Sequence, residues 1–75
     1  MKYEETIKVI SKVLEQMGAV DIAFQDTKKN NLIIAVFNCK EVTSFIADIT
    51  GWVYTGIQLD PTGGHQYKID FTKTS

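Results

Sequence analysis

Arginine is absent from this chain of 75 residues, and histidine, cysteine, proline and tryptophan each occur once. All eight basic residues are lysines, and nine acidic residues bring the formal net charge to −1. Proteins that bind nucleic acids usually rely on excess positive charge and on arginine, whose guanidinium group grips phosphates and guanine edges with paired hydrogen bonds. The composition therefore argues against a nucleic-acid-binding domain.

The single cysteine, Cys39, rules out a disulfide within the chain and is typical of a reducing compartment. No apolar run is long enough to cross a bilayer. The first residues turn acidic at Glu4 and Glu5, where a secretion signal would become apolar. We therefore expect a cytoplasmic protein that has no membrane partner.

Patterns typical of catalysis or metal binding are also scarce. His65 is the only histidine, so a site with two histidines cannot form within one chain. It follows Gly63 and Gly64, which match no phosphate-binding loop because no helix is expected after them. We interpret His65 as a loop residue and Cys39 as a small buried residue. We expect no enzyme, no cofactor and no metal site.

The first segment has the pattern of an amphipathic helix. Its apolar residues at positions 3, 7, 10, 14 and 17 recur every three or four residues, which places them on one helical face. Glu4 and Glu5 fall in the first turn, where the helix dipole favours negative charge. Gly18 follows, and glycine commonly ends helices in a left-handed conformation. The spacing predicts a helix over residues 3–17.

A hairpin of two strands should follow this helix. Val20, Ile22 and Phe24 alternate with polar or small residues, which is the period of a half-buried strand. A polar, turn-forming stretch at 26–31 leads to the run from Leu32 to Phe37, which is apolar at every position. Such a run is typical of a strand that is buried on both faces.

The second half of the chain predicts another helix and another hairpin. Asn38 and Glu41 form a capping box at the start of this helix, and Gly51 would end it. Its apolar stripe consists of Val42, Phe45, Ile46 and Ile49. Residues 52–59 predict a third strand, 60–63 a tight turn, and the alternation over 67–72 a fourth strand.

The two halves, residues 1–38 and 39–75, thus repeat one order of helix, strand and strand. Gly18 and Gly51, 33 residues apart, would end the helices, and Phe37 and Phe71 would end the hairpins. In one domain, such units predict an α+β two-layer sandwich: a four-stranded antiparallel sheet, its second and fourth strands central, with both helices on one face. This pseudo-twofold αββαββ arrangement resembles a circularly permuted ferredoxin-like fold, and the likeness implies no activity.

One face of this sheet would have no covering layer. If Val20, Val53 and Phe71 face the helices, the open face holds Ala23, Tyr54, Lys68 and Asp70, with Trp52 near its rim. Pairing Phe37 with Phe71 adds Leu32, Ile34 and Val36 to this face. The opposite parity would expose Ile33, Ala35 and Phe37. A contiguous apolar patch usually marks a contact surface, unless a loop or terminal segment covers it. A base-stacking platform for RNA would need more basic residues than Lys68 near its rings.

We therefore expect a non-enzymatic protein-interaction module that regulates or inhibits a larger protein and forms a homodimer. Compact single domains without a catalytic set include many inhibitors encoded by phages or mobile elements. The expected partner-binding residues are Ile34, Val36, Trp52 and Tyr54, because Trp and Tyr concentrate binding energy in interfaces. The expected polar or anion contacts are Lys28, Lys29, His65 and Lys68.

Two other functions remain open. The first is a small-ligand-binding protein, in which a dimer cleft captures a nucleotide or another anion with the glycine-rich loop, His65, Lys68 and Tyr54. The second is an enzyme assembled across a dimer, with His65 as its base.

Overall fold

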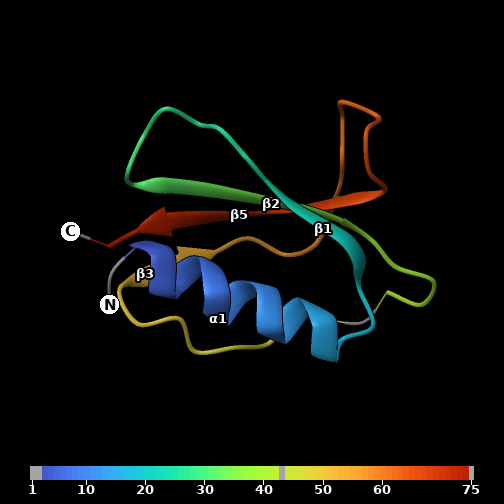
Figure 1. Ribbon diagram of the computed structural model, residues 1–75, viewed down its shortest axis with the longest axis horizontal. Coiled ribbons are helices and arrows are strands. Elements are labelled where there is room, and N and C mark those ends of the chain that lie inside the picture. The colour runs from blue at the N-terminus through green and yellow to red at the C-terminus, as the bar shows by residue number, and fades with distance from the viewer. Residues whose placement is uncertain (1–2, 43, 75) are drawn as a thin grey trace.

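The computed structural model describes residues 3–42 and 44–74. Its elements are α1 (Tyr3–Gln16), β1 (Val20–Gln25), β2 (Leu32–Asn38), β3 (Trp52–Tyr54), β4 (Gln58–Leu59) and β5 (Tyr67–Lys73). All strand pairs are antiparallel, in the order β1-β2-β5-β3, and β4 pairs with the start of β5. Figure 1 shows α1 lying along one side of the sheet. The α+β class is therefore confirmed.

The helix α1 forms where the apolar spacing predicts it. Ile10 and Leu14 are fully buried on its inner face. Gly18 adopts φ = 92°, and the amide of Ala19 donates to the carbonyl of Leu14 at 3.0 Å, which is the Schellman closure that a left-handed glycine permits. It is the one helix among the described residues, and it is too short and too polar to cross a membrane.

The hairpin of β1 and β2 also matches its prediction, with one irregularity. A bulge interrupts the pairing between Val20 and Ala23, and Asp21 adopts φ = 54° there. The bulge breaks the alternation at the start of β1, because the extra residue shifts side chains between faces. Val20, expected to face the helices, is consequently 57% exposed.

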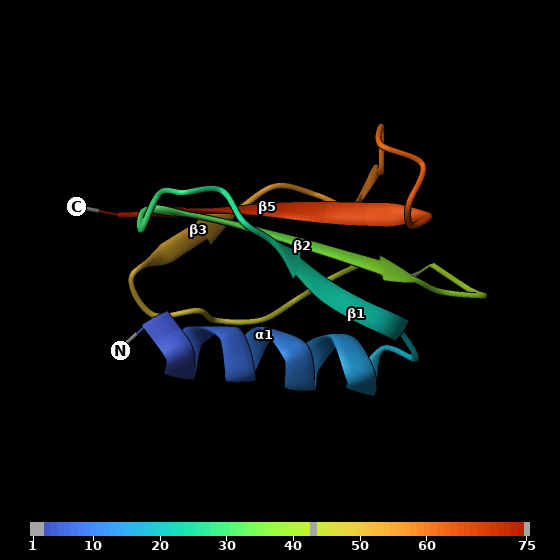
Figure 2. The same cartoon turned by 45° about the horizontal axis from the view of Figure 1, so that its top comes forward.

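The prediction of a second helix between Asn38 and Gly51 is wrong. Over the described residues of 39–51 the chain is irregular, and residues 44–51 run alongside α1 (Figure 2). Five of these thirteen residues are β-branched, which lowers helix propensity. Phe45 and Ile49 are buried in the core, whereas Ile46 from the same expected stripe is 81% exposed. A pseudo-twofold, permuted ferredoxin-like sandwich needs a helix here, so the structure does not support it.

The third predicted strand is shorter than expected. It divides into β3 and β4, which are separated by residues 55–57. The central positions of β2 and β5 agree with the order expected for the second and fourth strands. The sheet thus has five strands in place of the four predicted.

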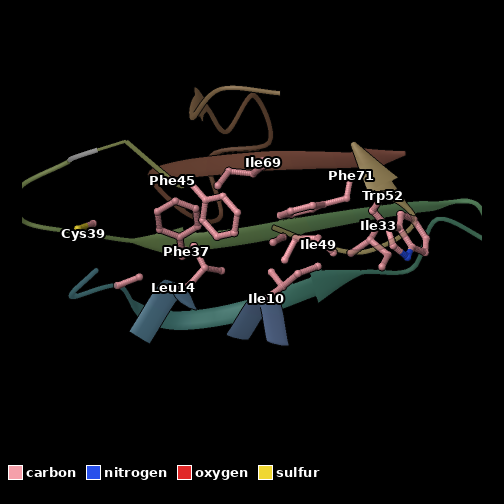
Figure 3. Packing of buried hydrophobic residues seen from close by; sticks show 12 residues of the cluster. Ile10, Leu14, Ile33, Phe37, Cys39, Phe45, Ile49, Trp52, Ile69 and Phe71 are labelled. Carbon is pink, nitrogen blue, oxygen red and sulfur yellow. The ribbon is translucent and has the colours of Figure 1, made fainter. Parts of the chain in front are cut away.

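The hydrophobic core lies between the sheet and the layer formed by α1 and residues 44–51. Figure 3 shows Ile10 and Leu14 of α1 below Ile33 and Phe37 of β2. Because β2 and β5 pair through Ile33 with Phe71 and through Ala35 with Ile69, the odd-numbered residues of both strands face this core. Their even-numbered residues point to the other side of the sheet.

Candidate functional site

The sheet surface opposite α1, here called the open face, is the principal candidate site. In both Figure 1 and Figure 2 the helix and residues 44–51 lie on one side of the sheet only. The loops at 26–31 and 60–66 rise toward the other side near opposite ends of β2 in Figure 1. The strand registers assign to the open face Ala23, Gln25, Leu32, Ile34, Val36, Val53, Lys68, Asp70 and Thr72.

An aliphatic strip, formed by Leu32, Ile34 and Val36, runs along the centre of the open face. Leu32 and Ile34 are half-buried, and Val36 is only 3% exposed. Val36 lies between Ala23 of β1 and Lys68 of β5, its direct partners across the sheet. The strip is therefore partly sheltered by its neighbours within the chain, and Val53, which is 56% exposed, extends the apolar surface at one end.

Charged groups flank this strip along β5. Lys68 Nζ lies 3.2 Å from Asp70 Oδ1 and donates a hydrogen bond to Asp70 Oδ2 at 3.4 Å. Their side chains are 19% and 29% exposed. Asp70 Oδ1 itself accepts no hydrogen bond from the described residues, although Nζ is close enough for an ion pair. Two opposite charges thus stand side by side on one face of one strand.

Four of the expected contact residues divide between two sides of the sheet. Ile34 and Val36 lie on the open face, as the pairing of Phe37 with Phe71 predicts for this side of β2. Trp52 and Tyr54 do not, and their expected placement is wrong. Trp52 is 8% exposed and belongs to the core, as Figure 3 shows.

Tyr54 also turns toward the core, because its register partner is the buried Phe71. Its ring stands edge-on to Phe45 at 5.0 Å between centroids and is tilted against Phe71 at 5.6 Å. Its hydroxyl donates to the carbonyl of Ala47 at 2.8 Å and accepts from the amide of Ala47 at 3.1 Å. Val53, expected to face the helices, takes the exposed position instead.

The expected polar contacts lie in three places. Lys68 is on the open face, beside Val36. Lys28 and Lys29 are exposed in the loop at 26–31, where Asp26 and Thr27 accept hydrogen bonds from their amides. His65 is half-buried in the loop at 60–66. Tyr54 faces the core and Lys68 faces away from it, so these two residues of the anion-binding wall expected at a dimer cleft lie on opposite sides of the sheet within one protomer.

Asp60 organises the loop that carries His65. The Asp60 side chain accepts hydrogen bonds from the Thr62 hydroxyl at 2.8 Å, the Thr62 amide at 3.0 Å and the His65 amide at 3.1 Å. The Thr62 hydroxyl bond, followed by the amide bonds, holds the pKa of Asp60 below its usual value against the opposing effect of burial. Gly63 adopts φ = 77° at the tip of this loop. Asp60 therefore stabilises the loop, and its carboxylate is already occupied by bonds within the chain.

A polar cleft lies at the junction of β1, β2 and this loop. It encloses about 610 Å³ and is lined by Val20, Asp21, Asn38, Cys39, Lys40, Gln66 and Tyr67. The Asn38 amide group donates to Asp21 at 3.2 Å and accepts from the Gln66 amide at 2.8 Å. The Gln66 side chain in turn accepts from the Cys39 amide at 3.1 Å. Asn38 was expected to cap a helix, but its side chain instead links the end of β2 to β1 and to the loop at 60–66.

Cys39 is a small buried residue, as predicted, although it does not lie in a helical turn. Its thiol donates to the carbonyl of Glu41 at 3.3 Å. Across residues 3–42 and 44–74, no group of three or more histidine, cysteine or acidic side chains is placed to hold a metal ion. Comparison with protein-family models, curated proteins and solved structures finds no match to this chain.

Proposed function

We propose that this chain is a small non-enzymatic protein-interaction module, a regulator or inhibitor that binds a larger protein and pairs with a second copy of itself. The observation that carries this proposal is the open face, where Leu32 and Ile34 on the central strand β2 are half-buried, Val53 is exposed, and no helix of the described residues covers this side of the sheet. Exposed apolar surface on a small domain usually marks a site that contacts another protein. Self-association also adds stability that a small core cannot supply alone.

The charges beside the strip favour a second copy as the occupant of the open face. In a twofold interface, if residue i contacts residue j of the partner, then j contacts i of the partner. Lys68 and Asp70 occupy neighbouring positions on one strand face and carry opposite charges. Each lysine in such a dimer can therefore meet the partner's aspartate while the two strips pack together.

Sedimentation velocity over a range of concentrations, combined with charge reversal, tests this dimer. The wild-type chain should dimerise, and Lys68→Glu or Asp70→Lys alone should weaken dimerisation because like charges then meet across the interface. The double variant Lys68→Glu/Asp70→Lys restores opposite charges and should recover much of the dimer. Lys12→Glu, at an exposed position of α1, is the matched control.

Circular dichroism must show that each variant stays folded. A wild-type chain that sediments as a monomer at every concentration contradicts the dimer. The same conclusion follows if the two single reversals leave the dimer as strong as in the Lys12→Glu control.

A further inference from the structure

A second surface, here called the edge groove, lies outside the open face. It separates the first two turns of α1 from the end of β1 and encloses about 530 Å³. Its apolar lining consists of Tyr3, Ile7 and Phe24, and its polar rim includes Glu4, Lys8 and Asp26. The groove is therefore an apolar hollow bordered by charges.

The groove exists because the core is incompletely covered beside β1. Phe37 on the central strand β2 is fully buried, but Phe24 on the outer strand β1 is only half-buried. On α1, Leu14 is fully buried whereas Tyr3, near the start of the helix, is 44% exposed. The apolar layer between helix and sheet thus opens to solvent at the outer side of β1.

The strand beside the groove is the edge of the sheet. β1 pairs with β2 on one side and with no other strand of the described residues. The bulge between Val20 and Ala23 disturbs the first part of β1, but pairing is regular from Ala23 to Gln25. An edge strand presents backbone amides and carbonyls that can pair with an added strand. The regular part of this edge lies next to the groove, because Phe24 and Gln25 line it.

We propose that the edge groove binds an extended segment of the larger partner protein, which adds as a strand beside Ala23–Gln25 and inserts one large apolar side chain between α1 and β1. In an added strand, side chains alternate between the two faces of the sheet, so the residue beside Phe24 points into the groove. This inference rests on the proposed function, in which the chain binds another protein, but it does not depend on the dimer.

The charges at the groove indicate the chemistry of the segment. Among the described residues that line the groove, Glu4 and Asp26 are exposed acids at the rim, and Lys8 is the one base. A segment with lysine or arginine next to its apolar side chain is therefore complementary. A second copy of β1 is not, because β1 and the residue after it carry Asp21 and Asp26 and no basic residue. Pairing β1 with itself would bring acids toward an acidic rim.

Selection of random short peptides displayed on phage, with the full chain as bait, tests this inference. Enriched peptides should carry one large apolar residue flanked by basic residues. In NMR titrations with the best synthetic peptide, amide shifts should concentrate at Ala23–Gln25 and along the first two turns of α1. Methylation of the peptide's backbone nitrogens that pair with β1 should abolish binding, because strand addition requires those donors.

Three variants sharpen the test. Ile7→Ala removes apolar lining and should weaken binding by about tenfold. Glu4→Lys changes only an exposed rim charge, so it should weaken binding of basic peptides without affecting the fold. Lys12→Glu, exposed on the same helix but absent from the groove lining, should leave binding unchanged.

The outcomes separate this inference from the dimer. Lys68→Glu should bind the peptide as wild type does, whether or not the wild-type chain dimerises. A library without enriched peptides, or peptides whose shifts map to the open face, overturns the edge-groove site while leaving the dimer proposal standing. Concentration-dependent shifts at Ala23–Gln25 without peptide would identify a second copy as the occupant and overturn it as well.

Discussion

Tyr54 connects β3 to the irregular segment through its hydroxyl group. The hydroxyl makes two hydrogen bonds to the backbone of Ala47, while its ring packs on Phe45 and Phe71. Tyr54→Phe keeps the ring and leaves the Ala47 amide and carbonyl without this partner. We expect a loss of about 1–2 kcal/mol in the free energy of unfolding, measured by urea titration.

Tyr67→Phe is the control for this prediction. Tyr67 is also half-buried and its ring packs against Phe37, but its hydroxyl makes no hydrogen bond to the described residues. We expect its removal to change stability by less than about 0.5 kcal/mol. Equal effects of the two substitutions would show that the Tyr54 hydroxyl does not hold the segment.

Asp60 makes the loop at 60–66 sensitive to acid. Its pKa in the folded chain is lowered, first by the Thr62 hydroxyl and then by amide bonds, relative to about 3.9 in the unfolded chain. A lowered folded-state pKa gives stability that is present above the unfolded pKa and lost as the pH falls through the folded pKa. Unfolding free energy should therefore decline below about pH 4, and this decline should be smaller in Asp60→Asn.

Asp48→Asn serves as the control, since Asp48 is exposed on the opposite layer and the change in net charge is the same. Urea titrations at neutral and acidic pH provide the measurement for all three proteins. If Asp60→Asn and Asp48→Asn lose the same share of the acid response, the loop carboxylate has no special role. An NMR titration of the Asp60 carboxyl group would then confirm or contradict the lowered pKa directly.

At the scale of elements, substitutions at Phe45 and Ile46 test whether the segment from 39 to 51 is an irregular chain anchored in the core or the helix predicted from the sequence. Phe45 is 6% exposed and packs between Tyr54 and Phe71, whereas its neighbour Ile46 is 81% exposed. Phe45→Ala should cost about 3–5 kcal/mol by leaving a cavity. Ile46→Ala should change stability by less than about 0.5 kcal/mol. In the helix expected from the sequence, both residues belong to the buried stripe and both changes would be costly.

The Phe45→Ala change can unfold so small a domain, so Phe45→Leu is the measurable substitute. It keeps part of the side chain and should cost about 1–2 kcal/mol in urea titrations. An exposed Ile46 is also expected to give fast side-chain motion in NMR relaxation. Comparable losses from Phe45→Leu and Ile46→Ala would indicate the helix instead of the anchored segment.

The elements that the sequence predicts well are those specified by local patterns. The helix α1 and the strands β1 and β2 each follow from one spacing rule over a short stretch. The failed helix had equally local signals, a capping box at Asn38 and Glu41. The capping box does not form, because the Asn38 side chain hydrogen-bonds instead to Asp21 and Gln66, which lie 17 and 28 residues away. No local pattern contains these partners.

The faces of the strands depend on pairing and not on composition. Every residue from Trp52 to Tyr54 is apolar or aromatic, so this stretch gives no alternation to read. The register decides it: Tyr54 pairs with the buried Phe71, which turns Tyr54 and Trp52 inward and Val53 outward. The side of β2 that holds Ile34 and Val36 was predictable, because matching Phe37 with Phe71 gave the correct parity.

At the scale of the whole molecule, the proposed dimer should make stability depend on concentration. When folding and association are linked, a hundredfold rise in protein concentration adds about 2.7 kcal/mol per dimer to the apparent free energy of unfolding. The urea midpoint of the wild-type chain should therefore rise with concentration.

The Lys68→Glu variant separates this linkage from intrinsic stability. It loses an ion pair between partly exposed side chains, which costs about 0–1 kcal/mol within one chain. Its midpoint should be somewhat lower than that of wild type at low concentration and should stay constant as concentration rises. The double variant Lys68→Glu/Asp70→Lys should regain the concentration dependence, because opposite charges again face each other across the twofold axis. A urea midpoint of the wild-type chain that does not change with concentration would contradict the dimer and show that the open face is solvent-exposed in the native state.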